Sequence, residues 1–496
     1  MRRSITLIAI LASAVSLPWI VGSPAPAGAA SEGKPDFNGD GYADLAVAAQ
    51  FENRGRGVVH VLYGSASGPS GAGSIVFGQD TAGVPGEAAP GDSFGAMLAF
   101  GNINGDAYDD LVVGSPFDDI SGKANAGSVT LFRGSATGLR LNGRLFTDTF
   151  GPTGTLHRDE YFGMGLAMGD YDGDGDDDIA VGIPYDDLDF DRDPSGVGRV
   201  KILRAQAGGF SEANVRVVQR SSLGSSIRRN FTAGFGFALA TLHGVADFDG
   251  LAIGMPEYST TQYAVGAVSV YRGGTTGMRY VDTYVGTYGT ESFFGAPLAA
   301  GDLGGDGNDD LAIGAYSAVG ARGRVAVIHL GRGREHVAGP HTISATNGGQ
   351  TPASGDGFGY SIAIDDDDAV AYLYVGAPGD EVGARLNAGS VFVFHSVGTG
   401  TPVGHDRMTP TTAVRNGGFG TQITLLDATN DGFDDVVVSA DYDTVGSKVG
   451  VGAVYWYDSN DGNPVTTGGV KFSQDTPGVP DRSETDDGFG STLAFL

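Results

Sequence analysis

The sequence contains no cysteine, and this absence excludes several kinds of chemistry. Without thiols there are no disulfides, no thiol nucleophile, no zinc–thiolate site and no acylated cysteine. Positive charge is also scarce, since 30 Lys and Arg stand against 59 Asp and Glu, for a net charge of -29. This charge argues against nucleic acid and anionic membranes as partners, and it favours bound cations.

The first 30 residues have a composition of their own. Arg2 and Arg3 precede an apolar stretch from Ile5 to Val21, which contains Pro18, and the small residues 27–30 follow. This order is typical of a secretory signal peptide, and no stop-transfer pattern follows that would retain it in a membrane. We therefore expect a mature chain over residues 31–496 that is secreted, has no membrane anchor and is a monomer.

A Phe-Gly pair recurs seven times in the remainder, and each copy opens a short apolar run. In most copies an acidic loop follows about eight residues later, and the spacings of 59 to 73 residues leave room for four short strands. The pairs begin at Phe94, Phe162, Phe235, Phe294, Phe358, Phe419 and Phe489. Such a repeat predicts an all-β fold, a seven-bladed β-propeller, in which each blade buries a sheet face that it could not bury alone.

Two kinds of strand are predicted after each acidic loop. The first is a short apolar run ending in a turn, as in Leu111–Gly114 and Ile179–Gly182, which is typical of a buried strand. The second mixes alternating and continuous apolar positions, as in Gly127–Gly134 and Gly266–Gly273, which indicates a strand nearer the rim.

The two ends of the repeat complement one another. The acidic loop at Asp36 has no Phe-Gly strand before it, and the last Phe-Gly strand, Phe489 to Leu496, has no acidic loop after it. We predict that this C-terminal strand completes the blade begun at the N-terminus, which leaves no open sheet edge between the two ends.

The Phe-Gly opening and the Gly-Ala-Pro turn, intact at Gly376–Pro378, resemble FG-GAP repeats, as in the N-terminal seven-bladed propeller of integrin α subunits. The resemblance runs from Asp36 to Leu496 and implies a secreted, calcium-stiffened binding or adhesion module. In the fold that it resembles, the calcium hairpins lie on one face and the variable loops on the other. The resemblance therefore places an extracellular protein or glycan ligand at the variable loops, since loops free of packing constraints carry recognition.

The acidic loops have the spacing of calcium sites. Calcium takes six to eight oxygens, which a loop supplies from positions 1, 3 and 5, a backbone carbonyl at 7 and a carboxylate at 9, with a glycine turn at 6. Loop one meets this order with Asp36, Asn38, Asp40, the carbonyl of Tyr42, and Asp44. Loop three meets it with the carboxylates of Asp170, Asp172, Asp174 and Asp178 and the carbonyl of Asp176. Its four ligating carboxylates predict the tightest binding. An EF-hand does not fit, because position 12 is Val47 or Val181.

The other copies of the acidic loop have fewer of these calcium ligands. Loop two offers Asn102, Asn104, Asp106 and Asp110, with Ala107 in place of the turn glycine. Loop five offers Asp302, Asp306 and Asp310, and loop seven offers Asp427, Thr429, Asp431 and Asp435. The fourth copy (His243, Asp247, Asp249) and the sixth (Asp366, Asp368) break the spacing. We expect three to five Ca²⁺ ions; the alternative is that Asp and Gly only make tight turns here.

We predict no catalytic residue. Ser93 lies in a Gly-x-Ser-x-Gly sequence, but the sister copies place Tyr161, Phe293 or a glycine at that position, and no helix is expected after it. A solvated acidic loop is expected at Asp186, Asp187, Asp189, Asp191 and Asp193, with paired carboxylates or a cation site as the alternative. Structural roles are expected for His60, His329 and His395, in strands near the rim.

Two classes of function fit these observations. The first is a secreted module that binds calcium and acts in ligand binding or adhesion. The second is a glycan-binding lectin, or a hydrolase or lyase acting on extracellular polysaccharide. Lectin sites favour aromatic stacking platforms, and the mature chain has a single tryptophan, Trp456, within a strand, which argues against the second class; the 19 tyrosines keep it open.

Overall fold

The computed structural model describes residues 35–152, 154–186, 198–206, 209–219, 234–244, 248–259, 264–289, 291–366, 370–396, 398–459 and 462–494. The predicted signal peptide, residues 1–30, lies outside these ranges. Within them, no helix combines the length and the apolar character that crossing a bilayer requires.

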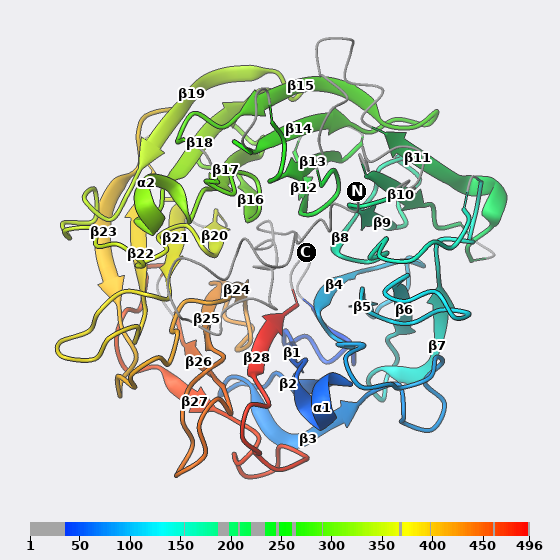
Figure 1. Cartoon of the computed structure of the whole chain (residues 1–496), viewed down its shortest axis with the longest axis horizontal. Coiled ribbons are helices and arrows are strands. Elements are labelled where there is room, and N and C mark those ends of the chain that lie inside the picture. The colour runs from blue at the N-terminus through cyan, green and yellow to red at the C-terminus, as the bar shows by residue number, and fades with distance from the viewer. Residues whose placement is uncertain are drawn as a thin grey trace, which may run out of the picture.

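Seven four-stranded antiparallel sheets stand around a common centre as the blades of a propeller (Figure 1). The predicted all-β, seven-bladed fold is therefore confirmed. From the innermost strand outward, blade 1 is β28 (Phe489–Leu493), β1 (Leu45–Ala49), β2 (Val58–Tyr63) and β3 (Ser70–Phe77). Blade 2 is β4 (Met97–Gly101), β5 (Asp110–Ser115), β6 (Ser128–Arg133) and β7 (Arg140–Phe146). Blade 3 is β8 (Gly165–Gly169), β9 (Asp178–Ile183), β10 (Arg199–Leu203) and β11 (Val215–Gln219).

The remaining blades repeat this order. Blade 4 is β12 (Leu239–Leu242), β13 (Gly250–Met255), β14 (Ala267–Arg272) and β15 (Arg279–Val285). Blade 5 is β16 (Leu298–Gly301), β17 (Asp310–Gly314), β18 (Val325–Leu330) and β19 (His336–Ile343). Blade 6 is β20 (Ile362–Asp365), β21 (Tyr372–Ala377), β22 (Ser390–His395) and β23 (Val403–Met408). Blade 7 is β24 (Ile423–Leu426), β25 (Asp435–Ala440), β26 (Ala453–Tyr457) and β27 (Val470–Phe472). Short helical turns are α1 (Glu52–Gly55), α2 (Ala318–Ala321) and η1 (Glu212–Asn214).

Burial decreases outward within each blade. The first three strands of blade 2 are buried apart from Arg133, whereas β7 alternates between exposed and half-buried residues. We expected His60 and His329 near the rim, and this was wrong: they lie in the third strands β2 and β18 and are buried. The fourth strand and the adjacent blades cover the third strand, so the rim consists of the fourth strands alone.

The Phe-Gly pair is the point where neighbouring blades interlock. The ring of Phe94 is buried and lies 6.1 Å from the ring of Phe77 in blade 1 and 6.3 Å from that of Phe132 in blade 2. Gly95 has φ 91°, and a Cβ there would lie 2.9 Å from the Cβ of Ala48. Only glycine tolerates both the left-handed backbone and this close approach, which explains the repeated pair.

The C-terminal strand closes the ring. β28 pairs antiparallel with β1, with Val47 opposite Leu493 and Ala49 opposite Phe489 (Figure 1). The Ala494 N–H donates to the Ala46 carbonyl at 3.1 Å. The predicted closure is confirmed, because it gives β1 a paired neighbour on each side, β28 and β2.

Candidate functional site

The acidic loops share one face of the propeller. Each lies before the second strand of its blade, so antiparallel pairing places all of them at the same end of the blades. Position 9 is the first residue of that strand or the one before it, and it is buried in loops one, two, three, five and seven. The Asp44 carboxylate accepts from Gly64 N–H at 3.0 Å and that of Asp110 from Gly134 N–H at 2.9 Å. Position 9 therefore ties the acidic loop to the connection between the third and fourth strands.

In loops one, three and five, three backbone N–H groups of the loop surround the carboxylate of position 1, an arrangement that we call the backbone cradle. In loop three, Asp170 Oδ1 accepts from the N–H groups of Gly173 at 2.7 Å and Asp174 at 3.1 Å, and its Oδ2 accepts from Gly175 at 3.0 Å. Asp36 and Asp302 make the equivalent three bonds, and Asp427 of loop seven makes two of them. The backbone of each loop therefore orients the carboxylate at position 1 of that loop.

Loop three also brings three carboxylates together. Oxygen atoms of Asp170, Asp172 and Asp174 lie within 4.8 Å of one another. Asp178, at position 9, is buried; its Oδ1 accepts from Ala205 N–H at 2.8 Å, and its Oδ2 has no hydrogen-bond partner among the described residues. An internal cation is nearby, because Arg204 Nη1 lies 3.1 Å from Asp172 Oδ2. The sequence did not indicate this arginine, which neutralises part of the charge of loop three.

Loop two has a different backbone. Asn102 Nδ2 donates to the Asp106 carbonyl at 2.7 Å, and Asn102 Oδ1 accepts only from Asn104 N–H at 3.3 Å. The glycines at position 6 of loops one, three, five and seven have φ between 79° and 94°, but Ala107 is not among the residues with positive φ. The cradle of position 1 is therefore missing, because alanine disfavours the left-handed turn that points three N–H groups inward.

In loops five and seven, side chains of the third strand contact position 9. His329 Nδ1 lies 2.7 Å from Asp310 Oδ2, and Trp456 Nε1 donates to Asp435 Oδ2 at 2.9 Å. Both side chains are buried, so Trp456 supplies no exposed stacking platform. These contacts orient the carboxylates, and they also compete with an ion for the same oxygen atoms.

The fourth copy of the acidic loop is contacted by a buried arginine from blade 5. Arg334 is fully buried and donates at 2.6 Å to the carbonyls of both His243 and Leu242. His243 Nδ1 lies 3.2 Å from Asp249 Oδ1, while Asp247 and Asp368 fall outside the described residues. The fourth copy, which we did not credit as a calcium site, is thus contacted by a positive charge from the next blade.

Position 8, which the sequence analysis missed, links adjacent blades. Asp109 Oδ2 accepts from Asp36 N–H at 2.9 Å, and Asp109 N–H donates back to the Asp36 carbonyl at 3.0 Å. The same reciprocal pair joins Asp177 to Asn102 and Asp249 to Asp170. The acidic face is therefore held together by a chain of contacts from blade to blade. An Asp directly before position 9 in loops two, three, five and seven was the available signal.

Burial raises the pKa of the inner carboxyls of this face. Burial, with neighbouring carboxylates as a smaller cause, raises the pKa of Asp44 to about 8 and that of Asp178 to about 8. Burial likewise raises the pKa of Asp435 to about 7 and that of Asp110 to about 6. Burial therefore makes protonation of these carboxyls easier than protonation of an exposed aspartate.

Aromatic side chains gather on the opposite face, where the second-to-third and fourth-to-first strand connections lie. Tyr161 has ring contacts to Phe117 at 5.5 Å and Tyr185 at 5.6 Å. A second group joins Tyr316 to Phe293 at 5.4 Å, in a stacked arrangement, and to Tyr360 at 5.1 Å. All six are half-buried and keep some surface exposed. The sequence analysis missed them; the signal was an aromatic residue beside several Phe-Gly pairs and Gly-x-Pro turns.

Two other expectations concern this face. Ser93 has φ 54°, but Tyr161 at 58° and Phe293 at 54° share that conformation, and strand β4 follows. The strained turn therefore belongs to the repeat. The solvated loop expected from Asp186 was wrong for that residue: Asp186 is buried, with Oδ2 at 3.0 Å from Arg199 Nε. Asp187, Asp189, Asp191 and Asp193 lie outside the described residues.

The fold and its repeats define a β-propeller of FG-GAP repeats. Family models of the FG-GAP repeat match residues 21–62, 94–132, 162–203 and 350–394. Integrin alpha-PS5 of Drosophila melanogaster is 34% identical over 155 residues, which is 30% of this chain and 14% of that protein. Integrin alpha-IIb of Mus musculus is 34% identical over 195 residues, covering 36% and 16%. The protein is an FG-GAP repeat propeller that resembles integrin α subunits, and the alignments span about one seventh of these relatives' length.

Two solved structures are more distant. A lectin from Aleuria aurantia, in complex with Fucα1-6GlcNAc, is 12% identical with a TM-score of 0.37, covering 79% of this chain and 96% of the lectin. A rhamnogalacturonan lyase from Bacillus licheniformis is 12% identical with a TM-score of 0.32, covering 75% and 71%. Similarity at this level gives no information about a shared ligand or activity.

Proposed function

We propose that this protein is a secreted calcium-binding propeller that recognises an extracellular protein or glycan with the face opposite its acidic hairpins. The observation that carries the proposal is the division of the molecule into two faces. One face carries the carboxylate hairpins with their backbone cradles, and the other carries half-buried aromatic rings on the less regular connections. Aromatic side chains that keep exposed surface are enriched at binding sites.

Calcium would be held by positions 1, 3, 5, 7 and 9 of the hairpins. Loops one and three, with cradles and a full set of oxygen ligands, are the strongest candidates, followed by loops five and seven. Loop two is the weakest because its cradle is missing. Calcium would neutralise carboxylates that repel one another, and the position 8 contacts would pass the added rigidity to neighbouring blades. It is proposed as a structural ion, with no role in a reaction.

Calcium binding is expected to depend on pH. Burial raises the pKa of Asp178 from 3.8 to about 8. Without calcium, the stabilising contribution of the protonated Asp178 is therefore complete below about pH 4. This contribution is lost as the pH rises from about 4 to about 8, because the buried carboxyl then ionises. Calcium requires the ionised form. The melting temperature measured with calcium minus that measured with EDTA should therefore increase between pH 6 and pH 8. A difference that is constant or decreasing over this range would contradict the assignment of Asp178 as a ligand.

The ligand face can be tested with paired aromatic variants. Wild-type protein on arrays of glycans and matrix proteins identifies the spots that it binds. Tyr161→Ala removes the ring at the centre of one aromatic group, and it should weaken binding to these spots by about tenfold or more, the cost of losing a well-placed interface aromatic. Tyr108→Ala, in acidic loop two, is the matched control and should leave binding unchanged. Binding lost in the control and retained in Tyr161→Ala would refute the assignment of the face.

The same array separates the two classes of function. A glycan-only pattern would favour a lectin, and release of reducing or unsaturated ends from bound polysaccharide would favour a hydrolase or lyase. Binding to proteins alone would support the adhesion module.

A further inference from the structure

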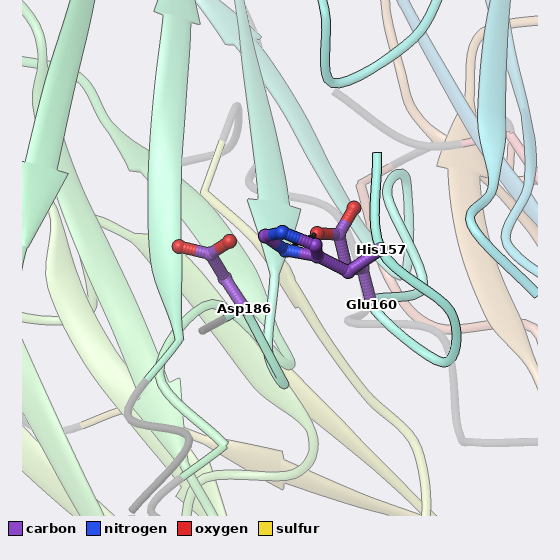
Figure 2. Close-up of side chains that lie close together, drawn as sticks. All are labelled: His157, Glu160 and Asp186. Carbon is purple, nitrogen blue, oxygen red and sulfur yellow. Dashed lines mark ion pairs between the residues drawn. The ribbon is translucent and has the colours of Figure 1, made fainter. Parts of the chain in front are cut away.

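A second cluster of side chains that can bind a metal lies on the face opposite the acidic hairpins, where we propose that the ligand binds. His157, Glu160 and Asp186 place one ligand atom each within 4.8 Å of the others (Figure 2). His157 and Glu160 lie in the connection between β7 and β8, and Asp186 follows β9. In Figure 2 the imidazole ring lies between the two carboxylates. Two separate connections of blade 3 therefore converge on one point.

Glu160 is a buried carboxylate that lacks a full set of partners. Its side chain is 1% exposed, and its Oε1 lies 2.8 Å from His157 Nδ1. Its Oε2 has no hydrogen-bond partner among the described residues. A buried polar atom without a partner is costly.

The nearby cations are directed mainly to another carboxylate. Arg199 Nη2 contacts both oxygens of Asp148, at 2.8 and 2.9 Å, and Lys201 Nζ lies 3.0 Å from Asp148 Oδ1. Arg199 also contacts the cluster itself, since its Nε lies 3.0 Å from Asp186 Oδ2. Such a contact fixes a ligand carboxylate in orientation, as outer contacts do in metal sites.

The repeat builds this cluster at defined positions. His157 and Glu160 stand five and two residues before Phe162, as Glu484 and Asp487 stand before Phe489. Glu52 corresponds to Asp186, and Glu52, Glu484 and Asp487 also lie within 4.8 Å of one another. Blade 2 has Asp92 and Asp118 at two of the positions and Ala89 at the third. The arrangement is therefore complete in blades 1 and 3, and only blade 3 has a nitrogen ligand.

We propose that His157, Glu160 and Asp186 bind a zinc ion at blade 3. One imidazole nitrogen and two carboxylate oxygens form a ligand set that zinc accepts, and such a set leaves a fourth position for water or for an oxygen of a bound ligand. Tetrahedral zinc with bonds of about 2.1 Å holds its ligand atoms about 3.4 Å apart, which lies between the 2.8 Å contact and the 4.8 Å limit seen in the cluster. The His157 side chain is 47% exposed, so the surrounding protein leaves its ring free to rotate.

Zinc binding is measured by titrating Zn²⁺ alone into full-length protein kept in excess calcium, with a competing chromophoric chelator. We expect one site in the wild type, weakened by more than about tenfold in His157→Ala and in Glu160→Gln, since losing a ligand costs at least as much as losing an outer contact. His336→Ala, which removes an exposed histidine on β19, is the control and should retain the site. Cobalt absorption in the visible range should appear in the wild type and be lost in His157→Ala.

A third variant guards against a general loss of structure. His157→Glu reproduces the all-oxygen cluster of blade 1 and should weaken zinc binding while melting like the wild type in calcium. Zinc affinity equal in wild type and His157→Ala, or lost equally in His336→Ala, would overturn the proposal. Because calcium saturates the hairpins throughout, failure here leaves the proposed function of the acidic face separately testable.

Discussion

Removal of calcium by EDTA is expected to lower the melting temperature of this protein substantially. Each occupied site adds RT ln(1 + [Ca²⁺]/Kd) to the free energy of unfolding, about 2.7 kcal/mol when calcium is at a hundredfold excess over Kd. Asp170, Asp172 and Asp174 place carboxylate oxygens within 4.8 Å of one another, and without calcium Arg204 and Arg216 would offset only part of their repulsion. Calorimetry in calcium and in EDTA, with a metal analysis of the purified protein, measures the effect.

A pair of position 5 variants makes this test specific. Asp174 Oδ1 accepts from Asp176 N–H at 3.1 Å, and Asp106 Oδ1 accepts from Tyr108 N–H at 2.9 Å, so alanine removes the same local turn contact in both. In calcium, Asp174→Ala should lower the melting temperature more than Asp106→Ala, because loop three has the cradle that loop two lacks. In EDTA the two variants should differ little. An unchanged wild-type curve in EDTA, with no calcium in the protein, would sink the calcium proposal.

Deletion of residues 489–496 is expected to cause aggregation or loss of cooperative unfolding. The deletion removes β28, whose Phe489 and Leu493 are buried, and it leaves the edge of β1 without a partner. An unpaired edge strand is a template for pairing with other chains. Size-exclusion chromatography with light scattering and thermal unfolding measure both consequences.

A point variant tests the same closure with less disruption. Phe489→Ala should lower the free energy of unfolding by about 3–5 kcal/mol, the usual cost of truncating a buried phenylalanine. The control, Val470→Ala in the rim strand β27, truncates an exposed side chain and should have a small effect. A deletion variant that stays monomeric and melts like the wild type would show that the propeller is stable without β28.

Much of the candidate site was predictable because it is local. The spacing of Asp36, Asn38, Asp40 and Asp44 lies within nine residues, and the cradle at position 1 needs only the backbone of the same loop. The substitution of Ala107 for glycine likewise predicted the altered loop two. Residues that reach the acidic loop from another strand or another blade were not predictable in this way. Arg204, which follows the third strand of the same blade, contacts Asp172, and Arg334 reaches the carbonyl of Leu242 in the preceding blade.

The amino-acid sequence by itself determined the number of blades, the order of strands, the closure by Phe489–Leu493 and the composition of each acidic loop. These features follow from a repeat whose Phe-Gly pair needs burial and a left-handed glycine. Only the tertiary structure decided which charges meet: Asp109 with the backbone of Asp36, His329 with Asp310, and His157 with Glu160 and Asp186. The reason is physical, because the ring brings residues of different blades and connections within hydrogen-bonding distance, and pKa values and metal affinity depend on those distances.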